Sequence, residues 1–229
     1  MKTTNNMPAR TNPFSTRFIR PGAIAYRFPP GFSPDDLVRQ LSESAWRGQI
    51  IGAHGSGKST LIASLIEPIE RAGRRVLLFA LRNGQRSLPR DWVRQARVSN
   101  ATAGLPRIAS STGGQAAGGT GHVCPVRLLI IVDGYEQLSF WSRLRLKLVC
   151  RQRAWGLLVT AHRDVGFPSL LRTRPSLEVA QAVVEMLMSA GESSLSPEAV
   201  AKTFADCQGN LRETLFVLYD RYEIRRKGE

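Results

Sequence analysis

The chain has 229 residues, of which 42% are hydrophobic, so it is long enough for a domain with a packed core and too apolar for wholesale disorder. It has no apolar run near the roughly 20 residues needed to cross a bilayer, and its three widely spaced cysteines indicate neither a metal site nor a disulfide framework. The formal net charge of +14, mostly from arginine, predicts attraction to nucleic acid, anionic lipid or an acidic protein, unless it is simply a solvated basic surface.

The N-terminal region is rich in proline and arginine. Residues 1–32 show no hydrophobic periodicity, which predicts an extended basic arm. Residues 1–20 lack the apolar segment of a secretory signal, so we expect a cytoplasmic protein. Ser33, followed by Pro34 and two aspartates, is typical of a helix start, and apolar residues follow at helical spacing as far as Ala45.

Short apolar runs then alternate with helical patterns. Strands are expected at residues 49–51, 76–81, 128–132 and 156–160, and helices at about 59–72, 90–97 and 141–153. This alternation predicts a three-layer α/β fold, with a mostly parallel sheet covered on both faces. In the last of these helices we expect apolar side chains to face inward, namely Leu144, Leu148 and Val149. We expect basic ones to face outward, namely Arg143, Arg145 and Lys147.

Two further segments complete the expected organisation. Residues 97–122 are rich in Gly, Ser, Thr and Ala, which predicts a flexible insertion. Beyond residue 175 the strand signal ends, and three helices are expected at about 177–190, 197–207 and 211–226. We therefore expect a basic arm (1–32), an α/β core (33–175) and a small C-terminal helical lid (176–229).

A phosphate-binding loop is the most specific motif. Residues 52–59 read Gly-Ala-His-Gly-Ser-Gly-Lys-Ser and match G-x-x-x-x-G-K-[ST] between a strand and a helix. Glycines let successive N–H groups curl around an anion, and the helix start adds the positive end of its dipole. We expect Lys58 to contact the β- and γ-phosphates of ATP or GTP, and Ser59 to coordinate Mg²⁺. The expected nucleotide-binding residues are Gly52, Ala53, His54, Gly55, Ser56, Gly57, Lys58, Ser59 and Thr60.

Two acids follow the most apolar expected strand. Asp133 ends that strand, where an α/β sheet places its ligand chemistry, and we expect it to hold Mg²⁺ together with Ser59. Glu136 lies three residues further on, near the start of the next helix. It would act either as a general base on the attacking water or merely as a favourable charge at a helix N-terminus.

The segment Leu128–Leu138 resembles the Walker B segment of AAA+ and STAND-type ATPases, in the form where Asp-Gly precedes a second acid. The resemblance implies an ATP- and Mg²⁺-binding P-loop ATPase with a helical lid. Gly134 occupies the usual position of the catalytic glutamate, which implies slow turnover. The resemblance also implies that Thr160 senses the γ-phosphate and that Arg212, in the Gly209–Glu213 segment, reaches the nucleotide from the lid.

Three functions are open at this point. The first is an ATPase that acts as a nucleotide-controlled switch on a macromolecular partner, with ATP favoured over GTP because no guanine-reading NKxD-like motif is present. The others are an ATP-gated nucleic-acid-binding module, using the arm and the helix at 143–153, and a small-molecule kinase. The resemblance further implies that residues ahead of the loop cover the adenine, where Tyr26 or Phe28 would either stack on the base or simply pack in the core or on the surface. In an oligomer, the candidates for an arginine supplied to a neighbouring subunit are Arg163, Arg172 and Arg174.

Overall fold

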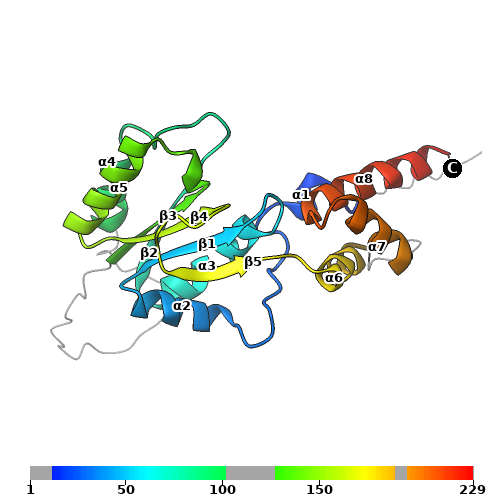
Figure 1. Cartoon of the computed structure of the whole chain (residues 1–229), viewed down its shortest axis with the longest axis horizontal. Helices are drawn as coiled ribbons and strands as arrows, with labels where there is room; N and C mark the ends of the chain where they lie inside the picture. The colour runs from blue at the N-terminus through cyan, green and yellow to red at the C-terminus, as the bar shows by residue number, and fades with distance from the viewer. Residues whose placement is uncertain (1–11, 102–126, 189–194, 229) are drawn as a thin grey trace, which may run out of the picture. The chain divides into compact units, whose positions relative to one another are not determined.

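The computed structural model describes residues 12–101, 127–188 and 195–228, which form two compact units. The sheet unit comprises residues 28–52 and 64–172, and the helical unit comprises residues 12–27, 53–63 and 173–228, within the described ranges. Figure 1 shows the elements of each unit. Most of the expected insertion at 97–122 lies outside the described residues, and residues 97–101 form the end of a helix.

Five strands form one sheet. They are β1 (Arg47–Gly52), β2 (Arg74–Ala80), β3 (Arg127–Asp133), β4 (Gly156–Ala161) and β5 (Ser169–Thr173), in the order β2-β3-β4-β1-β5. The pairs β2–β3, β3–β4 and β4–β1 are parallel, and the arrow of β5 runs with that of β1 in Figure 1. The strand β5 was not expected from the sequence.

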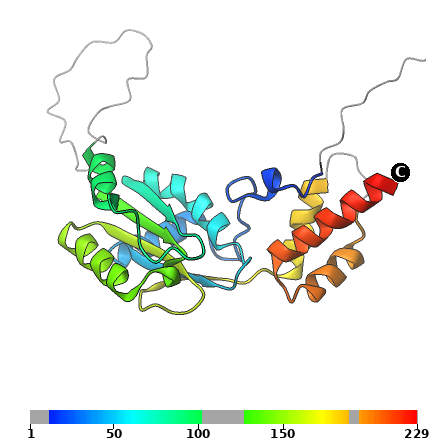
Figure 2. The same ribbon diagram turned by 90° about the horizontal axis from the view of Figure 1, so that it is seen from above.

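Helices cover the sheet on both sides, as Figures 1 and 2 show. They are α2 (Pro34–Glu43), α3 (Lys58–Arg71), α4 (Trp92–Ala101) and α5 (Phe140–Gln152), with a one-turn 3₁₀ helix, η2 (Tyr135–Gln137), between β3 and α5. The helix α2 begins as expected, because Ser33 and Asp36 form a capping box ahead of its first turn. The three-layer α/β fold predicted from the sequence is therefore confirmed.

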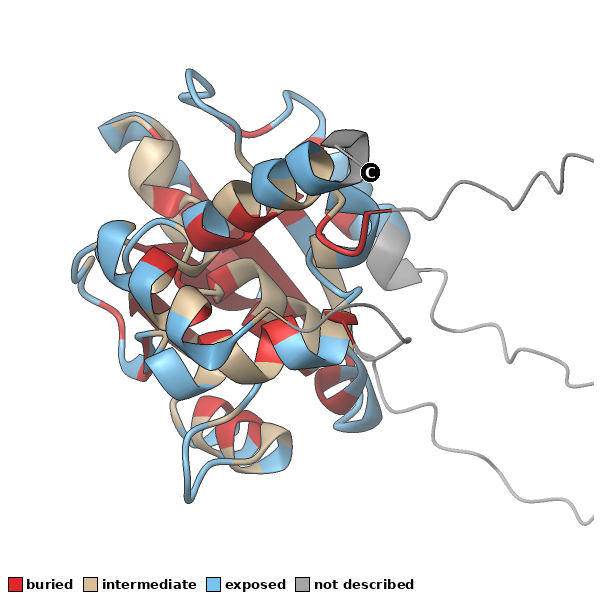
Figure 3. Ribbon diagram, turned by 90° about the vertical axis from the view of Figure 1, so that its right-hand side faces the viewer, coloured by how far each residue is buried: buried red, intermediate tan, exposed pale blue. Residues whose placement is uncertain are grey.

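Alternate residues of each central strand face opposite layers of the core. One set packs against α4 and α5, namely Leu128, Ile130 and Val132 of β3 and Leu157 and Val159 of β4, with Trp92, Ala96, Leu146 and Cys150 from the helices. On the other face, a Cβ added at Gly48 would meet Leu41 of α2 at 3.0 Å and Leu158 of β4 at 3.5 Å. Because both faces are covered, these strands read as continuous apolar runs. The strands are correspondingly red, the colour of buried residues, in Figure 3.

The orientation of α5 differs from the expected one. Leu144 and Leu148 are exposed, whereas Leu146 and Cys150 are buried, so the inward placement of Leu144 and Leu148 was wrong. The segment alternates apolar and basic residues, which places leucines on two faces of a helix. Burial of Leu146 and Cys150 in the core sets the observed face. Lys147 is half-buried, with its ammonium 4.7 Å from the centre of the Phe167 ring in a cation–π contact.

The helical unit contains α1 (Thr16–Ile19), α6 (Leu177–Met188), α7 (Pro197–Asp206) and α8 (Leu211–Gly228). Its core consists of Phe14, Val183, Val184, Met188, Val200, Leu215 and Leu218. The Asn12 amide donates to the Tyr219 carbonyl (3.1 Å) and to Glu223 (2.9 Å), so the first described residue of the arm is attached to α8. The division into arm, core and lid stays a prediction, because residues 53–63 group with the helical unit.

None of the described helices combines the length and the low polarity that crossing a lipid bilayer requires.

Candidate nucleotide-binding site

The expected phosphate-binding loop, residues 52–59, lies between β1 and α3. Gly55 (φ 70°) and Gly57 (φ 88°) adopt the left-handed backbone conformation that glycine tolerates without strain. Lys58 begins α3, and the Leu61 N–H closes its first turn on the Gly57 carbonyl at 2.8 Å. The loop therefore has the tight turn and the helix N-terminus that an anion site of this kind requires.

Two polar side chains hold this loop in shape. The Lys58 ammonium, only 9% exposed, donates to the Ala53 carbonyl at 2.7 Å, across the loop. The Ser56 hydroxyl is buried and forms a 2.6 Å hydrogen bond with the Thr173 hydroxyl. The sequence did not indicate the Thr173 contact, because the two residues are 117 positions apart.

The start of α8 packs closely against the loop within the helical unit. A Cβ built on Gly55 would lie 1.9 Å from Asn210 Oδ1 and 3.0 Å from the Cβ of Arg212. Asn210 Oδ1 accepts hydrogen bonds from the N–H groups of Arg212 (3.1 Å) and Glu213 (3.3 Å), so Asn210 caps the helix. The exposed Arg212 guanidinium lies 5.5 Å from the Phe216 ring centre. The structure thus brings the Arg212 backbone to the loop.

Tyr26 also lies beside the loop. Its ring is 3.4 Å from the position that a Cβ on Gly57 would take, and burial raises the pKa of its phenol. Of the two aromatic residues proposed to stack on a base, Tyr26 is therefore the one in the helical unit with the loop, while Phe28 belongs to the sheet unit.

A second polar group occupies the carboxyl edge of the sheet. Because β3 and β4 are parallel neighbours, Asp133 and Thr160 end adjacent strands. The Thr160 hydroxyl, fully buried, donates to Asp133 Oδ1 at 2.5 Å and accepts from the Gly134 N–H at 2.9 Å. Gly134 is left-handed (φ 86°), which turns the chain into η2. Thr160 therefore fixes the orientation of the Asp133 carboxylate.

Glu136 lies on η2 beside this pair. Its Oε1 is 3.4 Å from His162 Nδ1, and its backbone carbonyl accepts a 2.5 Å hydrogen bond from the Arg143 guanidinium. Within the described residues, the buried Glu136 Oε2 has no hydrogen-bond partner. Burial raises the pKa of the neighbouring Tyr135 to about 12. Sequence reasoning did not identify His162 as the partner of Glu136, because the two residues are distant in the chain.

The structure thus forms two groups of expected site residues. The helical unit holds Ala53, His54, Gly55, Ser56, Gly57, Lys58, Ser59, Thr60 and Arg212, and the sheet unit holds Gly52, Asp133, Glu136 and Thr160. No cluster of three or more His, Cys, Asp or Glu side chains suited to a metal occurs among the described residues. A P-loop protein needs none, because its Mg²⁺ is held by one or two side chains together with the phosphates.

Comparisons with known proteins support the fold. No protein-family model and no curated protein matches the chain. Among solved structures it is similar to Cdc6p from Pyrobaculum aerophilum, with a TM-score of 0.56 and 13% identity over 90% of this chain. PCH-2 from C. elegans gives a TM-score of 0.41 and 10% identity over 82% of this chain. The chain spans 65% of the Cdc6p structure and 67% of the PCH-2 structure. The similarity to Cdc6p shows that this chain shares its α/β fold.

Proposed function

We propose that this protein binds ATP with Mg²⁺ and acts as a nucleotide-controlled switch on a macromolecular partner, with slow hydrolysis. The observation that carries the proposal is the loop Gly52–Ser59: two left-handed glycines lead directly into the helix that begins at Lys58. A loop of this shape directs N–H groups toward an anion, and the AAA+-like fold favours a nucleotide as that anion.

The residues present fit a triphosphate and its metal. Lys58 already donates to a backbone carbonyl of the loop, and this donor would transfer to the β- and γ-phosphate oxygens. Ser59 in the helical unit and Asp133 in the sheet unit are the Mg²⁺ ligands that the sequence predicts, and Thr160 holds the Asp133 carboxylate in one orientation. When bound, Mg²⁺ neutralises charge on the phosphate oxygens.

Glu136 is the proposed general base. Its buried Oε2, which has no hydrogen-bond partner among the described residues, is able to accept a proton from an attacking water, while His162 steadies Oε1. Arg143 fixes the backbone of the same residue. Gly134 offers no side chain directly after Asp133, so we expect turnover to be slow, as suits a switch.

The contact between the loop and the start of α8 would allow nucleotide binding to affect the helical unit and its partner. Gly55 touches the capping residue of α8, so a change in the loop on phosphate binding would bear directly on the start of that helix. We expect Arg212, which is exposed and lies one helical turn from Phe216, to change its contacts when a γ-phosphate is present. Such differential contacts are what allow a nucleotide to shift a conformational equilibrium.

Steady-state ATP hydrolysis by the purified chain tests the proposal, with Lys58→Ala as the control. We expect slow hydrolysis that requires Mg²⁺, disappears in Lys58→Ala and changes when a macromolecular partner is added. Hydrolysis equal in both proteins would contradict the proposal. Acceleration by a small-molecule phosphate acceptor, with no response to polymers, would instead identify a kinase.

A further inference from the structure

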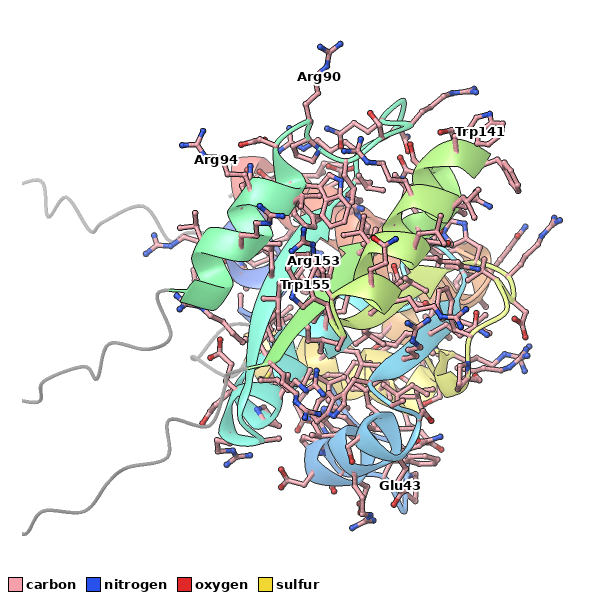
Figure 4. All side chains as sticks on the ribbon, turned by 90° about the vertical axis from the view of Figure 1, so that its left-hand side faces the viewer. Glu43, Arg90, Arg94, Trp141, Arg153 and Trp155 are labelled. Carbon is pink, nitrogen blue, oxygen red and sulfur yellow. The ribbon has the colours of Figure 1, made fainter. Side chains whose placement is uncertain are left out.

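We infer that one surface of the sheet unit docks single-stranded nucleic acid, the macromolecular partner of the switch. We call it the α4–α5 surface and define it as the segments 82–98 and 139–155. Its identification as the partner site rests on the proposed function, whereas the binding of a strand to this surface can be measured without ATP. Figure 4 views this side of the sheet unit, with α4, α5 and several of its side chains.

The net charge of the chain is concentrated on these two segments. Together they contain ten basic residues, Arg82, Arg86, Arg90, Arg94, Arg97, Arg143, Arg145, Lys147, Arg151 and Arg153. Against these stands a single acid, Asp91, so the segments carry +9 of the chain's +14. Nine of the ten are arginines, whose planar guanidinium matches phosphate oxygens in bidentate fashion.

The two segments lie on the same side of the sheet. The helices α4 and α5 both pack against the core face formed by β3 and β4. The loop before α4 also reaches the start of α5, because the Ser139 N–H donates to the Arg86 carbonyl at 2.9 Å. In Figure 4, Arg90, Arg94 and Trp141 point outward from this side. The arginines of the two segments therefore lie on one side of the sheet unit and form a single basic surface.

Aromatic side chains stand within this basic surface. Phe140 and Trp141, the first residues of α5, are 70% and 75% exposed, and their ring centres are 5.5 Å apart, edge to face. The exposed Leu144 and Leu148 lie on the same outward face of α5 as Trp141, opposite the buried side of the helix. Gathered apolar surface of this kind marks an interaction site. Exposed aromatic rings among arginines offer unpaired bases a stacking surface.

An extended polyanion fits this surface better than a lipid bilayer does. A membrane-bound amphipathic helix needs its charges beside one apolar stripe. Here half of the basic residues belong to the 82–98 segment rather than to α5. A strand that crosses both elements would contact the two sets of arginines and the aromatic pair together.

The same surface adjoins the proposed base. Arg143 of α5 donates to the carbonyl of Glu136, which lies three positions before Ser139, the N-cap of α5. A nucleic-acid strand stacked on Phe140 and Trp141 would therefore contact the first turn of α5, whose Arg143 side chain is hydrogen-bonded to the Glu136 carbonyl. Occupancy of the surface would thus change the rate of ATP hydrolysis.

Fluorescence anisotropy of a labelled oligo(dT), titrated with the full chain, tests the inference. Trp141→Ala should weaken binding about 5- to 100-fold, the loss of one stacked base. The slope of log affinity against log salt is negative, and Arg86→Ala and Arg145→Ala should each reduce its magnitude by about 0.7. The matched controls are Phe32→Ala and Arg39→Ala, an exposed aromatic and an exposed arginine outside the surface, which should bind as the unaltered chain does.

Each other outcome overturns the inference. No binding by the unaltered chain, or equal losses in Trp141→Ala and Phe32→Ala, would remove the site. Binding to vesicles containing phosphatidylserine without binding to oligo(dT) would identify a membrane surface. Equal binding to polyglutamate would show charge attraction alone.

The nucleotide site is tested separately. Lys58→Ala should lose ATP binding and keep oligo(dT) binding, whereas Trp141→Ala should keep ATP binding and weaken oligo(dT) binding, so the two proposals fail independently.

Discussion

The contact between Gly55 and Asn210 predicts an energetic coupling between the phosphate loop and the lid helix α8. Gly55→Ala places a Cβ on a left-handed residue (φ 70°), at a position 1.9 Å from Asn210 Oδ1. The Asn210 side chain must move away, and it then leaves the N–H groups of Arg212 and Glu213 that it caps. One substitution in the loop therefore also removes a helix cap.

The expected magnitudes follow from these two losses. The left-handed conformation costs a non-glycine residue about 1 kcal/mol, and loss of the cap costs about another 1 kcal/mol. Gly55→Ala should therefore lower the free energy of unfolding by about 2 kcal/mol, and Asn210→Ala by about 1 kcal/mol. In the double variant the cap is lost only once, so the total is about 2 kcal/mol and the coupling about 1 kcal/mol.

Urea denaturation of the four proteins measures this cycle. The control is Gly22→Ala, since Gly22 is also left-handed (φ 86°) and lies in the same unit, but its nearest neighbour to an added Cβ is the Ala63 Cβ at 3.7 Å. Gly22→Ala should be additive with Asn210→Ala. Additivity of Gly55→Ala with Asn210→Ala, within about 0.3 kcal/mol, would refute the contact.

Three further predictions concern the polar groups of the site. Thr160→Val should lower the free energy of unfolding by about 1 to 3 kcal/mol in urea denaturation, because it leaves the Gly134 N–H without its acceptor; an unchanged midpoint would show that the hydroxyl is dispensable. Glu136→Gln should keep ATP affinity in calorimetry and lose hydrolysis in a phosphate-release assay, and an unchanged rate would assign the base to another group. Arg212→Ala should reduce the preference for ATP over ADP, so equal affinities for the two nucleotides in the unaltered protein would remove its sensor role.

The central strands, and the glycine-rich turn that leads into α3, were predictable because their signals are local. Strands buried on both faces read as continuous apolar runs, and the loop has fixed glycine, lysine and serine positions. The strand β5 was missed because it is short, lies between Pro168 and Pro175, and has only two consecutive apolar residues, Leu170 and Leu171.

Other features depend on residues distant in the chain. Gln49 reads as part of an apolar strand. Its buried side-chain amide nevertheless donates hydrogen bonds to Asp164 and to the Phe167 carbonyl, more than 110 positions away. The orientation of α5 could not be read from its own sequence, because apolar and basic residues alternate there. It depends on the packing of Leu146 and Cys150 against β3 and β4. The pairing of Glu136 with His162 likewise requires β3 and β4 to be neighbours.

Calorimetric titration with ATP and Mg²⁺ tests the central claim most directly, using the unaltered chain, Lys58→Ala and Lys202→Ala. The last removes an exposed lysine from the same unit and so controls for charge. We predict that Lys58→Ala weakens ATP binding by more than about tenfold, the loss of a charged hydrogen bond, while Lys202→Ala has no effect. Affinity in Lys58→Ala equal to that of the unaltered protein would contradict the assignment of this loop as the phosphate site.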